Sequence, residues 1–125
     1  MENINKNKYR YPENIDAISG FGADSPYEHA CQKMVIAGME WHDQHPDAHV
    51  RFKTSEQIIG VPFEMSADCE SITNHMNDAI GGEASGMMVC TTLKHVLAAR
   101  RIGWDKYLQE IDNDWKEKVV SILKK

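Results

Sequence analysis

One segment of the chain carries signals for both ends of a helix. Ser25 is a good N-cap, and Pro26 suits the first helical position because its missing N–H costs nothing there. Glu28 lies three residues after Ser25, as in a capping box. Pro46 ends the pattern, because proline disfavours a helix that continues through it. These signals predict a helix over residues 25–45.

The predicted helix has one apolar face. At 100° per residue, that face carries Tyr27, Ala30, Cys31, Met34, Gly38 and Trp41. The charged residues, Glu28 among them, fall on other faces. Because glycine lowers helix propensity, we expect Gly38 to let a neighbouring segment approach closely. The helix should therefore face the core and be central to the fold.

Three further segments repeat apolar residues at helical spacing. Gly81-Gly82 follows the first of them, and Gly103 separates the other two, with Asp105 as a cap for the last. Short connections favour antiparallel neighbours. We therefore predict an all-α fold of about four helices, at residues 25–45, 66–80, 83–102 and 105–123.

The remaining segments are an N-terminal arm and an internal loop. Residues 1–24 are predicted to form an extended arm with a Gly-rich turn, in which glycines flank Phe21. We interpret Phe21 as a plug in the core; a mobile binding loop is the alternative. Residues 47–65 should form a structured loop, because a structureless loop of that length is unusual in a small domain. Residues 25–125 are then a single helical domain.

Composition argues against several classes of protein. A net charge of −5 argues against direct nucleic-acid binding, since nucleic-acid binders gain affinity by neutralising phosphates. The longest apolar run, at residues 34–39, is too short to span a bilayer, and the first fifteen residues lack the apolar core of a signal peptide. Cys31, Cys69 and Cys90 are odd in number and lie in apolar patterns, which suits reduced thiols. We expect a cytoplasmic protein without a membrane partner.

Histidines and aspartates gather at the end of the first helix. Imidazole and carboxylate are ligands for zinc, manganese or iron, which makes His42, Asp43 and His45 weak metal candidates. Their spacing does not match the i, i+4 arrangement of a helical metal pair, and Pro46 interrupts the helix before His49. We favour a polar helix end in which a histidine lies near the last carbonyl groups.

The His42-Asp43 pair resembles the dipeptide that names the HD phosphohydrolases, which are also all-helical. That family needs a second histidine and a second aspartate from other helices. His29, with Asp68 or Asp78, could fill these roles only by assumption.

Other catalytic motifs are missing from the sequence. Thiols on apolar faces stay protonated and inert. The chain has no Walker loop, no G-x-S-x-G, no Rossmann fingerprint and no helical E-x-x-E pair. These observations favour a non-enzymatic protein, and we expect no cofactor.

Basic and aromatic residues concentrate in one stretch of this acidic chain. The stretch reads K-H-V-L-A-A-R-R-I-G-W-D-K-Y, from residue 94 to residue 107. Arginine forks suit phosphate, and Trp104 offers a stacking plane for a base. The alternative is that the cations stabilise a helix C-terminus and that Trp104 packs on Leu108.

Three short segments resemble a group of uncharacterised small proteins of phages and mobile elements. They are I-D-A-I-S-G-F-G, Y-E-H-A-C-Q-K-M-V-I-A-G-M-E-W-H-D-Q-H-P and G-W-D-K-Y-L. The group has no established activity, so the resemblance implies no catalytic residue. It implies a context, in which a small phage protein disables a host defence component by mimicking nucleic acid or by sequestering a nucleotide signal in a helical oligomer.

The leading hypothesis is a homo-oligomeric binding protein of the phage immune-evasion kind, which sequesters a phosphorylated nucleotide. Its predicted ligand-binding residues are Lys94, Arg100 and Arg101 for phosphate, and Phe21, Tyr27 or Trp104 for the base. One alternative is an acidic protein-directed inhibitor of a host defence complex, with carboxylates at Glu64, Asp68, Glu70 and Asp78. The other is a metal-dependent phosphohydrolase using His42, Asp43 and His29.

Overall fold

The computed structural model describes residues 8–13, 15, 17–48, 50, 67–111 and 115–124. Within these ranges the chain is all-α, as predicted, with five helices and no strand. The helices are α1 (Pro26–Gln44), α3 (Ala67–Ala79), α4 (Gly86–Ile102), α5 (Trp104–Glu110) and α6 (Trp115–Lys124). None of the helices in this part of the chain has the length and apolar character needed to cross a membrane.

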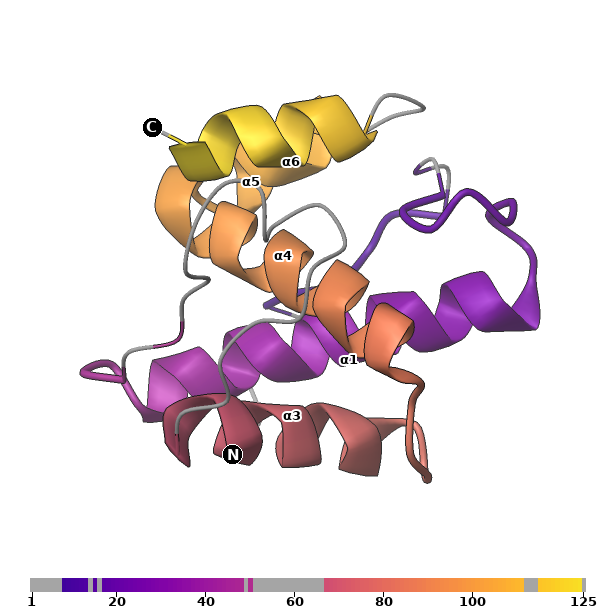
Figure 1. The fold of residues 1–125 in the computed structure, drawn as a ribbon. Helices are drawn as coiled ribbons and strands as arrows, with labels where there is room; N and C mark the ends of the chain where they lie inside the picture. The colour runs from indigo at the N-terminus through magenta and orange to yellow at the C-terminus, as the bar shows by residue number, and fades with distance from the viewer. Residues whose placement is uncertain are drawn as a thin grey trace.

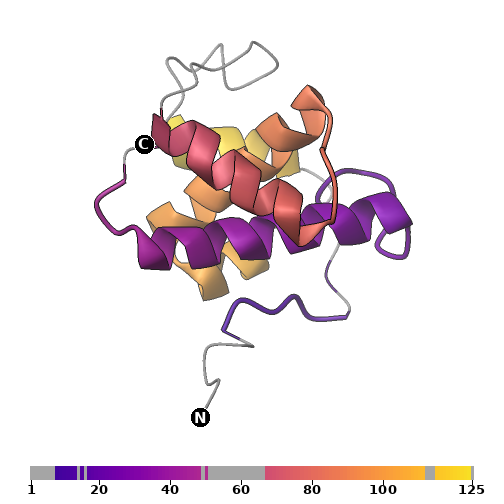
Figure 2. The same ribbon diagram turned by 90° about the horizontal axis from the view of Figure 1, so that it is seen from below.

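Helix α4 lies at the centre of the fold. It packs against α1 on one side and against α5 and α6 on the other, while α3 packs along α1 (Figure 1). Seen from below, α3 crosses α1 obliquely (Figure 2). The layers therefore run from α3 through α1 and α4 to the pair formed by α5 and α6.

The ends of α1 follow the sequence signals closely. The Ser25 hydroxyl accepts a hydrogen bond from the backbone N–H of Glu28 at 2.9 Å. At the other end, the backbone N–H of His45 donates to the Trp41 carbonyl at 3.0 Å. The predicted helix at residues 25–45 is thus confirmed, with Ser25 and His45 as its two caps.

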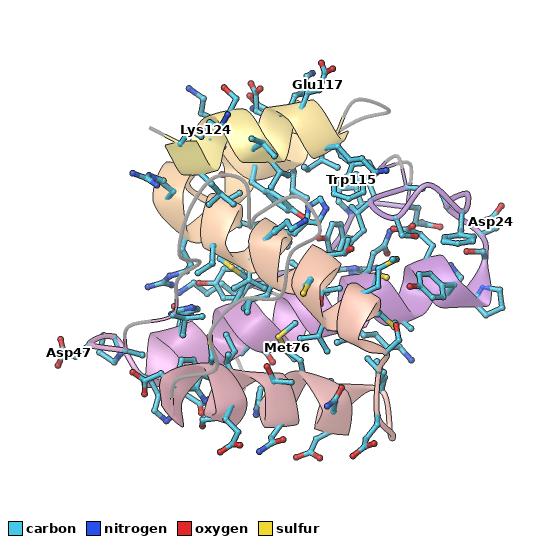
Figure 3. The ribbon with its side chains drawn as sticks, in the orientation of Figure 1. Asp24, Asp47, Met76, Trp115, Glu117 and Lys124 are labelled. Carbon is cyan, nitrogen blue, oxygen red and sulfur yellow. The ribbon has the colours of Figure 1, made fainter. Side chains whose placement is uncertain are left out.

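Gly38 marks the closest approach between α1 and α4. A Cβ atom at this position would lie 2.6 Å from Val96 Cγ2 and 3.5 Å from Met76 Sδ. Both neighbours are fully buried, and Met76 projects from α3 into the space between the three helices (Figure 3). The close approach predicted for Gly38 is therefore confirmed, and it joins α1, α3 and α4 at one point.

In the middle of the chain, the predicted start of one helix differs from the structure. Helix α4 begins at Gly86 rather than at residue 83, because Ser85 caps it by accepting from the Met88 N–H at 3.2 Å. Gly81, with a φ of 74°, follows the end of α3 as expected. Most of the predicted structured loop at residues 47–65, and the predicted first residue of the second helix, lie outside the described residues.

The segment predicted as one helix at residues 105–123 is divided into two. Helix α5 ends at Glu110, and Ile111 is extended, with φ −73° and ψ 123°. Ile111 is nevertheless buried, so apolar residues keep their helical spacing across the break. The sequence pattern therefore gives no sign of the break. Gly103, with a φ of 96°, ends α4 and also stands at the N-cap of α5, which places Asp105 in the first turn instead of at the cap.

The N-terminal arm packs onto the helices. Tyr9, Tyr11, Ile15 and Ile18 are buried and belong to the same apolar cluster as the helices. The rings of Tyr9 and Tyr11 make edge contacts with Trp104, with ring centroids 5.3 Å and 5.2 Å apart respectively. The described part of the arm is therefore a structural part of the core.

Replacing Gly38 with alanine should destabilise the protein. The same change on a free helix surface would gain about 1 kcal/mol of helix propensity, but here the added Cβ meets Val96. We expect a net loss of about 1–2 kcal/mol in the free energy of unfolding, measured by urea denaturation. Gly86→Ala is the matched control, because nothing lies within 4 Å of its Cβ position. A Gly38→Ala variant as stable as the parent would show that α1 and α4 do not meet here.

Candidate functional site

The side chain of Glu28 is buried and holds the segment that precedes α1. Its Oε2 accepts from the backbone N–H of Ile18 at 2.7 Å, and its Oε1 accepts from the N–H and the hydroxyl of Ser19 at 2.9 Å and 2.5 Å. A buried carboxylate is costly unless donors surround it, and here both oxygens have donors. The prediction that Glu28 faces away from the core is wrong, because the arm folds back over this face of α1.

The Gly-rich turn that follows this attachment points Phe21 outward. Gly20 and Gly22 have φ values of 83° and 90°, which favour glycine, so the predicted turn is confirmed. Phe21 itself is 63% exposed, and its ring lies 4.6 Å from the Tyr27 ring. The prediction of a core plug is wrong for Phe21, because Ile18 occupies the core instead.

A cavity of about 240 Å³ opens between this turn, the start of α1, α4 and α6. Its walls include three aromatic side chains, two lysines and the aliphatic surface of α6. These residues are Phe21, Tyr27, Trp115, Lys94, Lys116 and Val120. Figure 3 shows Trp115 at the start of α6, on the side that faces the N-terminal segment. The cavity therefore combines flat apolar walls with positive charge.

The two lysines give this cavity a local charge opposite to that of the whole chain. Lys94 is half-buried, and burial lowers its pKa; the nearby Lys116 ammonium acts in the same direction. In the described part of the chain, neither lysine forms an ion pair with a carboxylate. An anion in the cavity would thus relieve the repulsion between two cations.

The structure brings together only half of the sequence-predicted ligand residues. Phe21, Tyr27 and Lys94 line the cavity. Arg100 is not among the residues that line this cavity, and its Nη1 donates to Asp43 Oδ1 at 2.8 Å. Trp104 is partly buried between the arm tyrosines and the end of α4.

Arg101 lies at a different cavity, of about 280 Å³, near the C-terminal ends of α4 and α6. Its Nη1 donates to the backbone carbonyl of Leu123 at 3.0 Å. Lys106, Lys118 and Glu110 also line this space. Arg101 therefore stabilises a helix C-terminus, which was the alternative to a ligand site. The helix that it stabilises is α6, and not its own helix α4.

The metal candidates of the α1 C-terminus have other partners. His45 stacks on Trp41 with ring centroids 4.2 Å apart, and its Nδ1 lies 2.9 Å from the Trp41 carbonyl oxygen. Asp43 accepts from Lys8 Nζ at 3.1 Å and from the Tyr9 hydroxyl at 2.8 Å, in addition to Arg100.

His42 is buried, and burial lowers its pKa to about 4. No three His, Cys, Asp or Glu side chains in the described ranges are grouped so as to hold a metal ion; His49 lies outside those ranges. The set proposed for a phosphohydrolase, which combines His42 and Asp43 with His29, is therefore not assembled as a metal group.

The structure describes three of the four carboxylates that we proposed for a protein-binding surface. Glu70 and Asp78 are exposed on α3, and Asp68 is partly buried. Glu64 lies outside the described residues. Two exposed carboxylates on one helix are also typical of an ordinary solvated face.

A buried polar chain supports the wall of the cavity, and the sequence reasoning missed it. His95 Nδ1 lies 3.1 Å from the Tyr107 hydroxyl, which lies 2.7 Å from the Tyr11 hydroxyl. The His95 ring also packs 5.0 Å from the Trp115 ring. Burial lowers the pKa of His95 to about 3, so its ring is neutral. Its spacing from Thr92 and Ala99 on the buried face of α4 was the available signal.

None of the three cysteines forms a disulfide, and burial makes the thiols of Cys31 and Cys90 poor nucleophiles. Cys31 and Cys69 are buried, and Cys90 is partly buried. Burial raises the pKa of Cys31 to about 11 and also raises that of Cys90. The prediction of reduced core thiols is confirmed for Cys31 and Cys69.

No protein-family model, no curated protein and no solved structure matches this chain. The resemblance to small proteins of phages and mobile elements therefore stays a prediction.

Replacing Glu28 with glutamine should lower the free energy of unfolding by about 2–4 kcal/mol. The amide NH₂ of glutamine would face a donor where a carboxylate oxygen now accepts. Urea denaturation measures the change. Glu70→Gln on the exposed side of α3 is the matched control and should cost less than about 0.5 kcal/mol. If the parent and the Glu28→Gln variant are equally stable, the hydrogen bonds from Ile18 and Ser19 to Glu28 do not hold the arm to α1.

His95 should make the protein sensitive to acid. Its pKa is about 3 in the folded state against a normal value of 6.5, so between these values only the unfolded state binds the proton. This histidine therefore lowers the free energy of unfolding by about 1 kcal/mol for each pH unit as the pH falls from 6.5 toward 3. His95→Gln should show a shallower dependence of stability on pH than the parent, in urea denaturation between about pH 7 and 5.

Parallel slopes for the parent and His95→Gln would mean that His95 is not held neutral in the folded protein.

Proposed function

We propose that this protein is a non-enzymatic binding protein that captures a small phosphorylated ligand with a planar ring, such as a nucleotide. The site is the cavity between the Gly-rich turn that carries Phe21, here called the Phe21 turn, and helices α4 and α6. The observation that carries the proposal is the pairing of Lys94 and Lys116, which lack ion-pair partners among the described residues, with three aromatic walls. Lysine binds phosphate as a point charge, and aromatic rings stack on bases with about 1–3 kcal/mol each.

The exposed apolar side chains support a binding role for this cavity. Within the described ranges, the exposed large hydrophobic side chains are Phe21, Tyr27 and Met87, at 63%, 37% and 78% exposure. All three line the same cavity. Scattered apolar residues on a surface are ordinary, but apolar side chains gathered around one opening indicate a place where a ligand or partner lies.

The size of the cavity limits the ligand. Its volume of about 240 Å³ is below the roughly 300–1,000 Å³ that is usual for sites enclosing drug-sized ligands. A nucleotide would therefore place its base or its phosphate inside and leave the remainder at the exposed rim, near Phe21 and Met87. Such a site favours a small ligand over a long polymer.

This proposal keeps the ligand class that the sequence predicted and changes the residues. Lys116 takes the place of Arg100 and Arg101, and Trp115 takes the place of Trp104. In the context that the phage resemblance implies, the captured compound would be a nucleotide signal of host defence. A homo-oligomeric state remains part of the prediction.

Two charge-matched double variants test the site. Lys94→Gln with Lys116→Gln should lose capture, because it removes both cations from the cavity. Arg100→Gln with Arg101→Gln removes the same charge and should retain capture, because neither arginine lines the cavity. The measurement is a thermal-shift screen against nucleoside mono- and diphosphates and cyclic nucleotides. A ligand at a hundred times its Kd adds about 2.7 kcal/mol, which raises the Tm by several degrees.

The opposite pattern, with capture lost only in the arginine variant, would place the ligand at the cluster that the sequence alone suggested. A screen without any stabilising nucleotide would contradict the proposal. The alternative function, an acidic protein-directed inhibitor, would then be favoured. The complex of such an inhibitor with its protein partner should weaken steeply as the salt concentration rises.

A further inference from the structure

Lys94 and Lys116 occupy different environments in the same cavity. Lys94 is half-buried on α4, at a wall that it shares with Trp115 and Val120. Lys116 is exposed at the start of α6, and its ammonium lies 5.7 Å from the centre of the Trp115 ring, which attracts a cation. One lysine is therefore desolvated, and the other is solvated and placed over an aromatic face.

These environments lower the pKa of Lys94 and so increase the share of neutral amine at a given pH. Burial lowers its pKa, and the positive charge of Lys116 lowers it further. Among the described residues, the thiol of Cys90 on the same helix raises the pKa of Lys94, but burial raises the pKa of that thiol, so it carries little negative charge near pH 7. A lysine that is desolvated and lies beside a second cation is the arrangement that activates amines toward carbonyl compounds.

We propose that Lys94 is the nucleophilic amine of this cavity and forms a reversible imine with a phosphorylated aldehyde or ketone whose phosphate is held by Lys116. The inference rests on the proposed function, because the phosphate and ring contacts are those of the same cavity. It adds a covalent step that nucleotide capture alone does not require.

The step balances without any further reactant. The lone pair of Lys94 Nζ attacks the carbonyl carbon and forms the C–N bond, while the π electrons of the carbonyl move to its oxygen. That oxygen leaves as water with the two hydrogens that the neutral amine gives up. The ammonium of Lys116 is the acid in the cavity that can protonate the departing oxygen, and the proton returns to it from the amine.

The experiment uses the full chain and two probes, pyridoxal 5′-phosphate and pyridoxal. The protein is incubated with an equimolar amount of either probe, and sodium borohydride then reduces any imine to a stable amine. Peptide mapping by mass spectrometry gives the label at each lysine. With pyridoxal 5′-phosphate we expect several-fold more label at Lys94 than at the exposed Lys33 and Lys124, and this preference should vanish in urea.

Two variants connect the labelling to the cavity. Lys94→Arg keeps the positive charge but cannot form an imine, so it should lose the dominant label while Lys33 and Lys124 keep theirs. Lys116→Gln should reduce labelling of Lys94 by pyridoxal 5′-phosphate more than labelling by pyridoxal, because only the first probe has a phosphate. Label spread evenly over the exposed lysines, or total label unchanged in Lys94→Arg, would overturn the inference.

The nucleotide screen on the parent protein separates this inference from the proposed function. Selective labelling of Lys94 without nucleotide stabilisation would support the imine and contradict nucleotide capture. Nucleotide stabilisation without selective labelling would support capture and reject the reactive amine.

Discussion

The hydrogen bonds between the Glu28 carboxylate and the backbone of Ile18 and Ser19 hold the arm against the helices. Because Ile18 is fixed there, it enters the core, and the turn that follows it carries Phe21 out to the rim of the cavity. A buried carboxylate gains its stability from its donors, so the arm and α1 depend on each other. Without this attachment the cavity would lack one of its walls.

The parts of the fold that the sequence predicted depend on local chemistry. Ser25 and Gly81 mark helix ends because capping and positive φ involve only neighbouring residues. Gly38 was recognised because a glycine within an apolar stripe has few other uses. Glu28 and Ile111 were misplaced because their surroundings come from a segment folding back and from a helix break, and helical periodicity contains neither.

The residues of the candidate site likewise include some that the sequence predicted and some that only the packing brings together. Lys94 was found from the sequence because basic residues are conspicuous in an acidic chain, whereas Lys116 was missed because only the packing of α6 against α4 brings it to the same cavity. Arg100 was assigned to a ligand because its partner, Asp43, is 57 residues away in the chain. The net charge of −5 likewise gives no sign that two lysines of the described residues line the same cavity.

We propose that one cavity, lined by α4, α6 and the Gly-rich turn that carries Phe21, takes a phosphorylated ring compound. An NMR titration of the full chain with the four common ribonucleoside 5′-monophosphates tests it most directly, because every backbone amide reports separately. The proposed site predicts shifts that concentrate at Ser19, Phe21, Thr91 and Lys94. Shifts at Arg100, Arg101 and Trp104 instead, or no shifts with any of the four compounds, would contradict it.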